Sequence, residues 1–204
     1  MTAAVLTENQ VVTRHLVPEE PIENARGRGD PLGERVDGLA RRGDLLGERG
    51  DPLEVRTIRP GDETLVEEMS ADLSARSLYR RFFAGTPRVP RVVLRQLAAV
   101  DHCRSEAVLA LHGGRLVGWA QYVMPPGSAD ADFAVIVADG WHRRGVSKRL
   151  GDRLVDLARA RGITHFTASV LADNNPAICA LAARWPHAHA AYDGNLITFR
   201  MSLA

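Results

Sequence analysis

Hydrophobic and polar positions form a regular succession of strand-like and helix-like stretches from about residue 54 onward. Residues 55–59 alternate as a half-buried strand does, and apolar residues recur at helical spacing from Val146 to Leu157. The Gly113-Gly114 pair between two apolar runs predicts a hairpin. The predicted strands are 55–59, 107–111, 116–123, 133–138, 166–171, 187–192 and 196–201, and the predicted helices include 79–83, 92–100, 144–161 and 176–184. This order predicts an α+β domain with one parallel crossover through the long helix.

An internal repeat with a period of seven runs through residues 28–55, where arginine, aspartate and leucine each recur at that spacing. Glycine and proline, among them Gly29, Pro31 and Gly43, interrupt any coiled-coil helix that the heptad would favour. We therefore interpret residues 1–53 as a low-complexity, flexible N-terminal extension and residues 54–204 as the folded domain.

Composition narrows the range of partners. The 204 residues have a formal net charge of +1, and no apolar run approaches the roughly 18–20 residues needed to cross a bilayer. A nucleic-acid partner would require a concentrated basic face, which the sequence does not display. Residues 1–10 lack the pattern of a secretory signal. We expect a cytoplasmic protein with neither a membrane nor a nucleic-acid partner.

Only two cysteines occur, Cys103 and Cys179, and their spacing matches neither a zinc site nor a redox pair. Cysteine is among the residues most often found in protein interiors. The sequence therefore predicts two buried, reduced thiols and no metal site.

The segment between the predicted strand 133–138 and the long helix carries the clearest chemical signal. The first backbone N–H groups of a helix have no intrahelical acceptor, and the helix dipole places partial positive charge there. Gly145 allows close approach of a ligand, and Arg143, Arg144 and Lys148 add positive charge around it. These features predict a site that holds a diphosphate by main-chain donors.

This segment resembles the coenzyme A loop of the GNAT acetyltransferases. The family pattern is Gln or Arg, two residues, Gly, one residue, then Gly or Ala, and here it reads His142-x-x-Gly145-x-Ser147. Serine is nearly as small as alanine and has a hydroxyl that can donate to a phosphate. We expect His142 to act mainly through its backbone N–H.

The resemblance extends from about residue 58 to 185 and is closest to bacterial Pat-like protein lysine acetyltransferases, through residues 76–83 and 131–139. It implies a GNAT fold, in which helices flank a mostly antiparallel central sheet, and acetyl-CoA as co-substrate. The residues that it assigns to the cofactor are Val135, Ile136, Val137, His142, Arg143, Arg144, Gly145, Val146, Ser147, Lys148 and Asn174.

The resemblance also implies direct attack of an amine on the thioester, and it assigns catalytic roles to Asp132 and Val137. Asp132 stands where Pat-like sequences have a glutamate base, and a backbone N–H near Val137 is the expected donor to the developing oxyanion. Glu106 is a second candidate base, although a surface charge is the expected role. Leu181 stands where many family members have a tyrosine that protonates the leaving thiolate.

Three functions remain open from the sequence. The first hypothesis is acetylation of a protein lysine, and the second is acetylation of a small amine such as an antibiotic, polyamine or metabolite. The third is a catalytically idle regulator that binds acyl-CoA, which the aspartate at 132 and the leucine at 181 motivate. No nucleotide-sensing domain is expected in residues 1–53, and the oligomeric state, monomer or homodimer, stays open.

Overall fold

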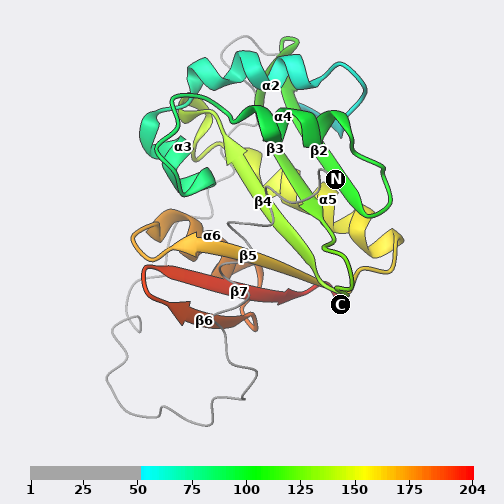
Figure 1. The fold of residues 1–204 in the computed structure, drawn as a ribbon, viewed down its shortest axis with the longest axis vertical. Helices are drawn as coiled ribbons and strands as arrows, with labels where there is room; N and C mark the ends of the chain where they lie inside the picture. Colours follow the sequence, from blue (N-terminus) through cyan, green and yellow to red (C-terminus); the bar gives the residue numbers. More distant parts are fainter. Residues whose placement is uncertain (1–51) are drawn as a thin grey trace.

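The computed structural model describes residues 52–204, which form a seven-stranded sheet flanked by helices (Figure 1). The strand order is β1-β2-β3-β4-β5-β7-β6, and all neighbours pair antiparallel except β4 and β5. The strands are β1 (Glu54–Thr57), β2 (Ser105–His112), β3 (Arg115–Val123), β4 (Ala131–Val137), β5 (His165–Leu171), β6 (His189–Asp193) and β7 (Leu196–Ser202). The predicted α+β order with one parallel crossover is confirmed.

The helices occupy the two faces of this sheet. They are α2 (Glu63–Met69), α3 (Ala75–Phe82), α4 (Arg91–Ala98), α5 (Val146–Ala160) and α6 (Asn175–Arg184), with short 3-10 turns η1 (Ser70–Asp72) and η2 (Asp139–Trp141). The long helix α5 starts two residues later than the sequence pattern predicts. Arg143 has φ 61° and Gly145 has φ 74°, and this left-handed backbone cannot continue a right-handed helix.

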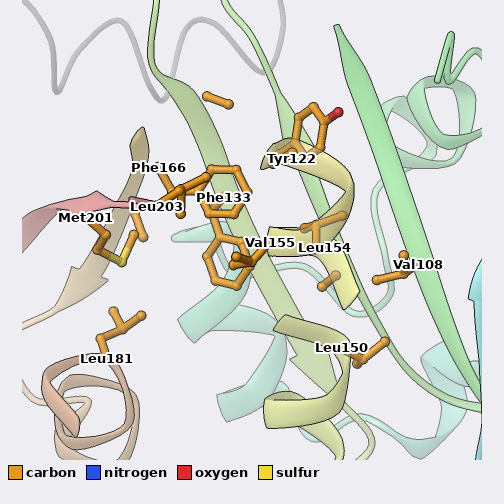
Figure 2. Packing of buried hydrophobic residues seen from close by; sticks show 14 of the residues in the cluster. Val108, Tyr122, Phe133, Leu150, Leu154, Val155, Phe166, Leu181, Met201 and Leu203 are labelled. Carbon is orange, nitrogen blue, oxygen red and sulfur yellow. The ribbon is translucent and has the colours of Figure 1, made fainter. Parts of the chain in front are cut away.

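Alternate residues of β2, β3 and β4 face two separate hydrophobic clusters, and the buried residues of β5 and β7 belong to the first of them. On one face, α5 and α6 cover Phe133, Phe166 and Met201, and the rings of Phe133 and Phe166 stack with centroids 5.3 Å apart (Figure 2). On the other face, α2, α3 and α4 cover Trp119 and Ile136. Leu53 is also buried in the first cluster, so the core includes a residue that the sequence pattern assigned to the extension. Residues 1–51 of the predicted extension lie outside the described residues.

The sheet opens between β4 and β5. Their parallel ladder has only two pairs, Ala131 with Phe166 and Asp132 with Thr167. Beyond these pairs the strands diverge toward their carboxyl ends, as Figure 1 shows, while β3 stays paired with β4 as far as Val137. The gap lies at the centre of the sheet, between the half that contains β1 to β4 and the half that contains β5 to β7.

The prediction of buried thiols is wrong, because both cysteines are exposed. Cys179 lies on α6 beside Ile178, but Ile178 and Leu181 are the positions that face the core, which leaves Cys179 on the outer side of the helix. Cys103 lies in the loop before β2, directly after His102 with φ 55°. Within residues 52–204 no helix is long and apolar enough to cross a bilayer.

Candidate active site

The N-terminus of α5 presents uncapped main-chain donors. Gly145 is the N-cap residue and no side chain caps this end of the helix. The first helical bond runs from the Arg149 N–H to the Gly145 carbonyl at 3.1 Å, so the amides of Val146, Ser147 and Lys148 precede the regular ladder. The first turn contains no acidic residue. Free donors and the positive end of the helix dipole suit a bound anion.

The basic side chains near this helix end are already partly engaged. The Arg144 guanidinium lies over the Trp141 ring, 5.0 Å from its centroid. Lys148 Nζ lies 2.7 Å from an Asp152 carboxylate oxygen, and 72% of its side chain is exposed. The anion site therefore depends chiefly on main-chain N–H groups, with these cations raising the local potential.

His142 uses its groups differently from the expectation. Its backbone N–H donates to the Asp139 carbonyl at 3.3 Å, which closes the η2 turn. Its ring Nε2 lies 2.9 Å from the Val137 carbonyl, and because a carbonyl only accepts, the ring donates. The expected backbone role of His142 is therefore corrected: its backbone N–H holds the turn and its side chain holds the end of β4.

Main-chain groups of β4 face the gap in the sheet. The Ala138 N–H donates to the Val117 carbonyl next to β3 at 2.9 Å, and main-chain groups alternate sides along a strand. This alternation turns the N–H groups of Val135 and Val137 toward β5, where the ladder has already ended. Ile136 faces β3 with its main chain and the second cluster with its side chain. Val135 and Val137 are therefore the positions whose amides can contact a molecule in the gap.

Two cavities meet at this gap. The first, about 310 Å³, lies among α3, α4, β4, β5 and α6, and the second, about 430 Å³, lies among β4, α5 and α6. Phe133, Val135, Ala180 and Leu181 line both. The second cavity also contacts Ser147 and Lys148, so it joins the uncapped end of α5 to the opening in the sheet. Together the cavities can take an elongated molecule with one anionic end.

Asn174 lies at the start of α6 and lines the first cavity. Its side chain makes no capping bond to α6, which leaves the amide for a molecule in the cavity. The structure thus brings Val135, Ser147, Lys148 and Asn174 to the two cavities. Gly151, Arg80 and Arg81 also line the cavities and were missed by the sequence analysis, although an isolated glycine within a helical pattern is a recognised signal of close approach.

Asp132 lies where β4 and β5 last pair. It is half-buried and accepts a hydrogen bond from the Thr167 hydroxyl. Ala134, two residues further along the same face, lines the first cavity. Two residues of strand span about 7 Å, so the carboxylate lies one repeat from the cavity wall. A bridging water or a long acceptor side chain can cover that distance.

Glu106 cannot serve as a base, and the expectation that it is a surface charge is also wrong. Its side chain is fully buried, with one oxygen 2.7 Å from Arg161 and the other 2.9 Å from His102. It pairs in the sheet with Tyr122, whose ring belongs to the cluster beneath α5. Glu106 therefore holds the C-terminal end of α5 to β2.

Asp139 connects the loop before α5 to α3. Its carboxylate accepts from the Ser74 backbone N–H at 3.1 Å and from the Ser77 hydroxyl at 2.6 Å. Partial burial acts to raise the pKa of Asp139, but the hydrogen bonds from Ser74 and Ser77 outweigh burial and hold the pKa below its usual value. Helix α3, which lines the first cavity, is thus fixed to the loop that leads into α5, which lines the second cavity.

A model of the acetyltransferase (GNAT) family matches residues 68–184, more than half of the chain. The chain belongs to this family. The predicted GNAT fold and the predicted acetyltransferase class are thereby confirmed at the level of the family.

A curated relative is Acetyltransferase Pat of Mycolicibacterium smegmatis, 29% identical over 152 residues. The match covers 69% of this chain and 45% of the relative, so the chain spans less than half the length of that protein. Among solved structures, the GNAT domain of S. lividans PAT has a TM-score of 0.69 and 24% identity, with 76% of this chain and 92% of that chain covered. A PaiA N-acetyltransferase from Thermoplasma acidophilum, in complex with coenzyme A, has a TM-score of 0.59 and 12% identity, with 74% and 98% covered. These structural likenesses show the GNAT fold.

One position within this GNAT domain departs from the common family arrangement. Leu181 on α6 is 9% exposed and lines both cavities, at the position where many members have a tyrosine. Among the described residues that line the cavities, none is Asp, Glu, His, Tyr or Cys. Groups of three metal-binding side chains are likewise absent from residues 52–204.

Proposed function

We propose that this protein transfers the acetyl group of acetyl-CoA to a primary amine, with a protein lysine as acceptor, in the cytoplasm. The observation that carries the proposal is the uncapped N-terminus of α5, which opens beside the gap between β4 and β5. The similarity to Acetyltransferase Pat supports a protein acceptor.

The co-substrate would lie across both cavities. The amides of Val146, Ser147 and Lys148 would hold its diphosphate, with Arg143 and Arg144 contributing positive potential. The main-chain groups of Val135 would hydrogen-bond the pantetheine arm, because β5 no longer pairs with them. Gly145 and Gly151 provide backbone without side chains along this path.

Asp132 would remove a proton from the acceptor amine. A lysine amine has a pKa near 10.4, so only about one in a thousand is neutral near pH 7.4. The Thr167 hydroxyl donates to the Asp132 carboxylate and would hold it in place. As the amine attacks, the N–H at Val137 would donate to the carbonyl oxygen that gains charge, and His142 would hold the adjacent peptide at the end of β4 by its bond to the Val137 carbonyl.

Departure of the thiolate needs no protein acid. A thiol has a pKa near 8.5, so a thiolate leaves from a tetrahedral intermediate and takes its proton from water. Leu181 keeps this part of the site apolar. We expect the absence of a phenol to lower the rate without abolishing transfer.

Purified protein incubated with acetyl-CoA and either lysine peptides or a panel of polyamines, sugars and antibiotics tests the proposal. Release of free CoA together with acetylated peptide, identified by mass spectrometry, supports protein lysine acetylation. Release only with small amines would instead assign a small-molecule N-acetyltransferase. Calorimetric binding of acetyl-CoA without turnover on any acceptor would assign an acyl-CoA-binding regulator, and no binding at millimolar acetyl-CoA would refute all three.

A further inference from the structure

One half-buried arginine in the first cavity lacks the carboxylate partner that other shielded arginines of the domain have. Arg81, near the end of α3, lines this cavity, and its Nε is buried without a hydrogen-bond partner in the described part of the chain. Its guanidinium lies 5.0 Å from the centroid of the neighbouring Phe82 ring. Residues 52–204 offer it no carboxylate within ion-pair distance. A cation is thus held against an apolar wall.

Other arginines with shielded side chains show what is missing. Arg56 lies 2.6 Å from Asp62, and Arg161 lies 2.7 Å from Glu106. Burial lowers the pKa of Arg81 to about 10, so its guanidinium remains charged at neutral pH. A charge that is partly shielded from solvent and has no partner costs folding free energy, and a buried polar atom without a hydrogen bond calls for an explanation such as a bound ligand.

The surrounding structure holds Arg81 in this position. Asp139 anchors the start of α3 through Ser74 and Ser77, and Phe82 packs into the second cluster. Arg80 donates to the Asp173 carbonyl across the cavity at 3.3 Å. The helix therefore cannot rotate to bring Arg81 into solvent without breaking these contacts.

We propose that Arg81 binds a carboxylate carried by one of the two substrates and so sets the specificity of transfer. The inference rests on the proposed function, because it treats the first cavity as the place where acyl group and acceptor meet. The carboxylate can belong to the acyl chain, as in a short dicarboxylic thioester, or to the acceptor amine. Phe83, Val92 and Val93 provide apolar walls around the Arg81 guanidinium, and Arg80, the other guanidinium on the α3 side, already donates to the Asp173 carbonyl.

The experiment compares wild type with Arg81→Gln and Arg81→Lys. Arg76→Gln is the matched control, because Arg76 lies exposed on the same helix and away from both cavities. One arm measures kcat/KM for acetyl-CoA and succinyl-CoA with an uncharged amine acceptor. The other arm uses acetyl-CoA with amines that carry or lack a carboxylate.

Wild type and Arg76→Gln should prefer the carboxylate-bearing partner in one arm by at least about tenfold, and Arg81→Gln should remove that preference. In Arg81→Gln, kcat/KM for acetyl-CoA with an uncharged amine should change less than about threefold. Arg81→Lys, with a single point charge, should retain part of the preference. Absence of a preference in both arms, or an equal loss with every pair of substrates, would overturn the proposal.

Binding separates this inference from the proposed function. Calorimetric titration with acetyl-CoA, succinyl-CoA and succinate measures recognition of the carboxylate without turnover. If no amine is acetylated but succinyl-CoA or succinate binding depends on Arg81, the proposed function fails and the inference stands. If acetylation proceeds and neither ligand nor acceptor binding depends on Arg81, the inference alone fails.

Thermal unfolding adds a readout that a structural arginine would not give. Removing a half-buried cation that has no partner should leave the melting temperature of the free protein unchanged or raised in Arg81→Met. A lower melting temperature, with Arg76→Gln unaffected, would show that the guanidinium is already paired in the free protein and would overturn the proposal.

Discussion

Replacing Gly151 by alanine separates the fold of α5 from its role at the second cavity. Gly151 lies within α5, is buried, and lines the second cavity. An added Cβ would meet no atom within 4 Å, so the protein itself leaves room for a methyl group. The volume that the methyl would fill is the volume in which we place the pantetheine arm of acetyl-CoA.

The two expected effects have opposite signs. Alanine in a helix interior is more favourable than glycine by about 1 kcal/mol, which in a domain of this size raises the melting temperature by about 2–4 °C. A methyl group in a binding cavity disturbs affinity by about 1–3 kcal/mol, or roughly 10- to 200-fold. Gly151→Ala should therefore be more stable than wild type and bind acetyl-CoA at least about tenfold more weakly.

Differential scanning calorimetry and isothermal titration measure both quantities on the same preparation. Gly85→Ala is the control, because a Cβ there also meets nothing within 4 Å and Gly85 does not line either cavity. It should change stability by about 1 kcal/mol or less and leave affinity unchanged. Wild-type affinity in Gly151→Ala would show that acetyl-CoA does not occupy the second cavity.

Three further changes test the site and its supports. Asp132→Asn should lower kcat at least about tenfold with acetyl-CoA affinity unchanged, whereas equal turnover in stopped-flow assays would remove Asp132 from the mechanism. A Cβ at Gly118 would lie 3.0 Å from the Ile136 carbonyl oxygen, so Gly118→Ala should destabilise the fold by about 1–3 kcal/mol in urea unfolding. The lowered pKa of Asp139 contributes stability that is complete above the pKa of an unfolded aspartate and is lost as pH falls through the lower folded value. Asp139→Asn should therefore show a smaller loss of stability between about pH 5 and pH 2, and an unchanged acid profile would contradict the assigned hydrogen bonds.

The strands and helices were predictable because their signals are local. Alternation in residues 55–59 and helical spacing after Val146 depend only on neighbours along the chain. The start of α5 was misplaced by two residues, since the left-handed backbone of Arg143 is unusual for a residue with a Cβ. The predicted position of the anion site is unchanged by this error, because Gly145 is the N-cap of α5 and ends the loop.

Contacts between distant segments were not predictable in the same way. From its sequence context Glu106 is predicted to be a surface charge, because its partner Arg161 lies 55 residues away along the chain and only the fold brings the two together. The position of Arg81 in the first cavity likewise depends on how α3 packs. The sequence around Arg81 predicts only a helix with several basic residues. The gap in the sheet depends on where the β4–β5 ladder stops, and no residue type encodes that register.

The two-pair ladder between β4 and β5 has a mechanical consequence. The two halves of the sheet are joined there by very few main-chain hydrogen bonds. Local opening of the domain should therefore occur first along this seam between β4 and β5. A molecule bound in the seam would replace the missing hydrogen bonds between β4 and β5 and would connect the two halves of the sheet. Binding of such a molecule should therefore slow amide hydrogen exchange in the strands on both sides of the seam, including at residues that do not contact it.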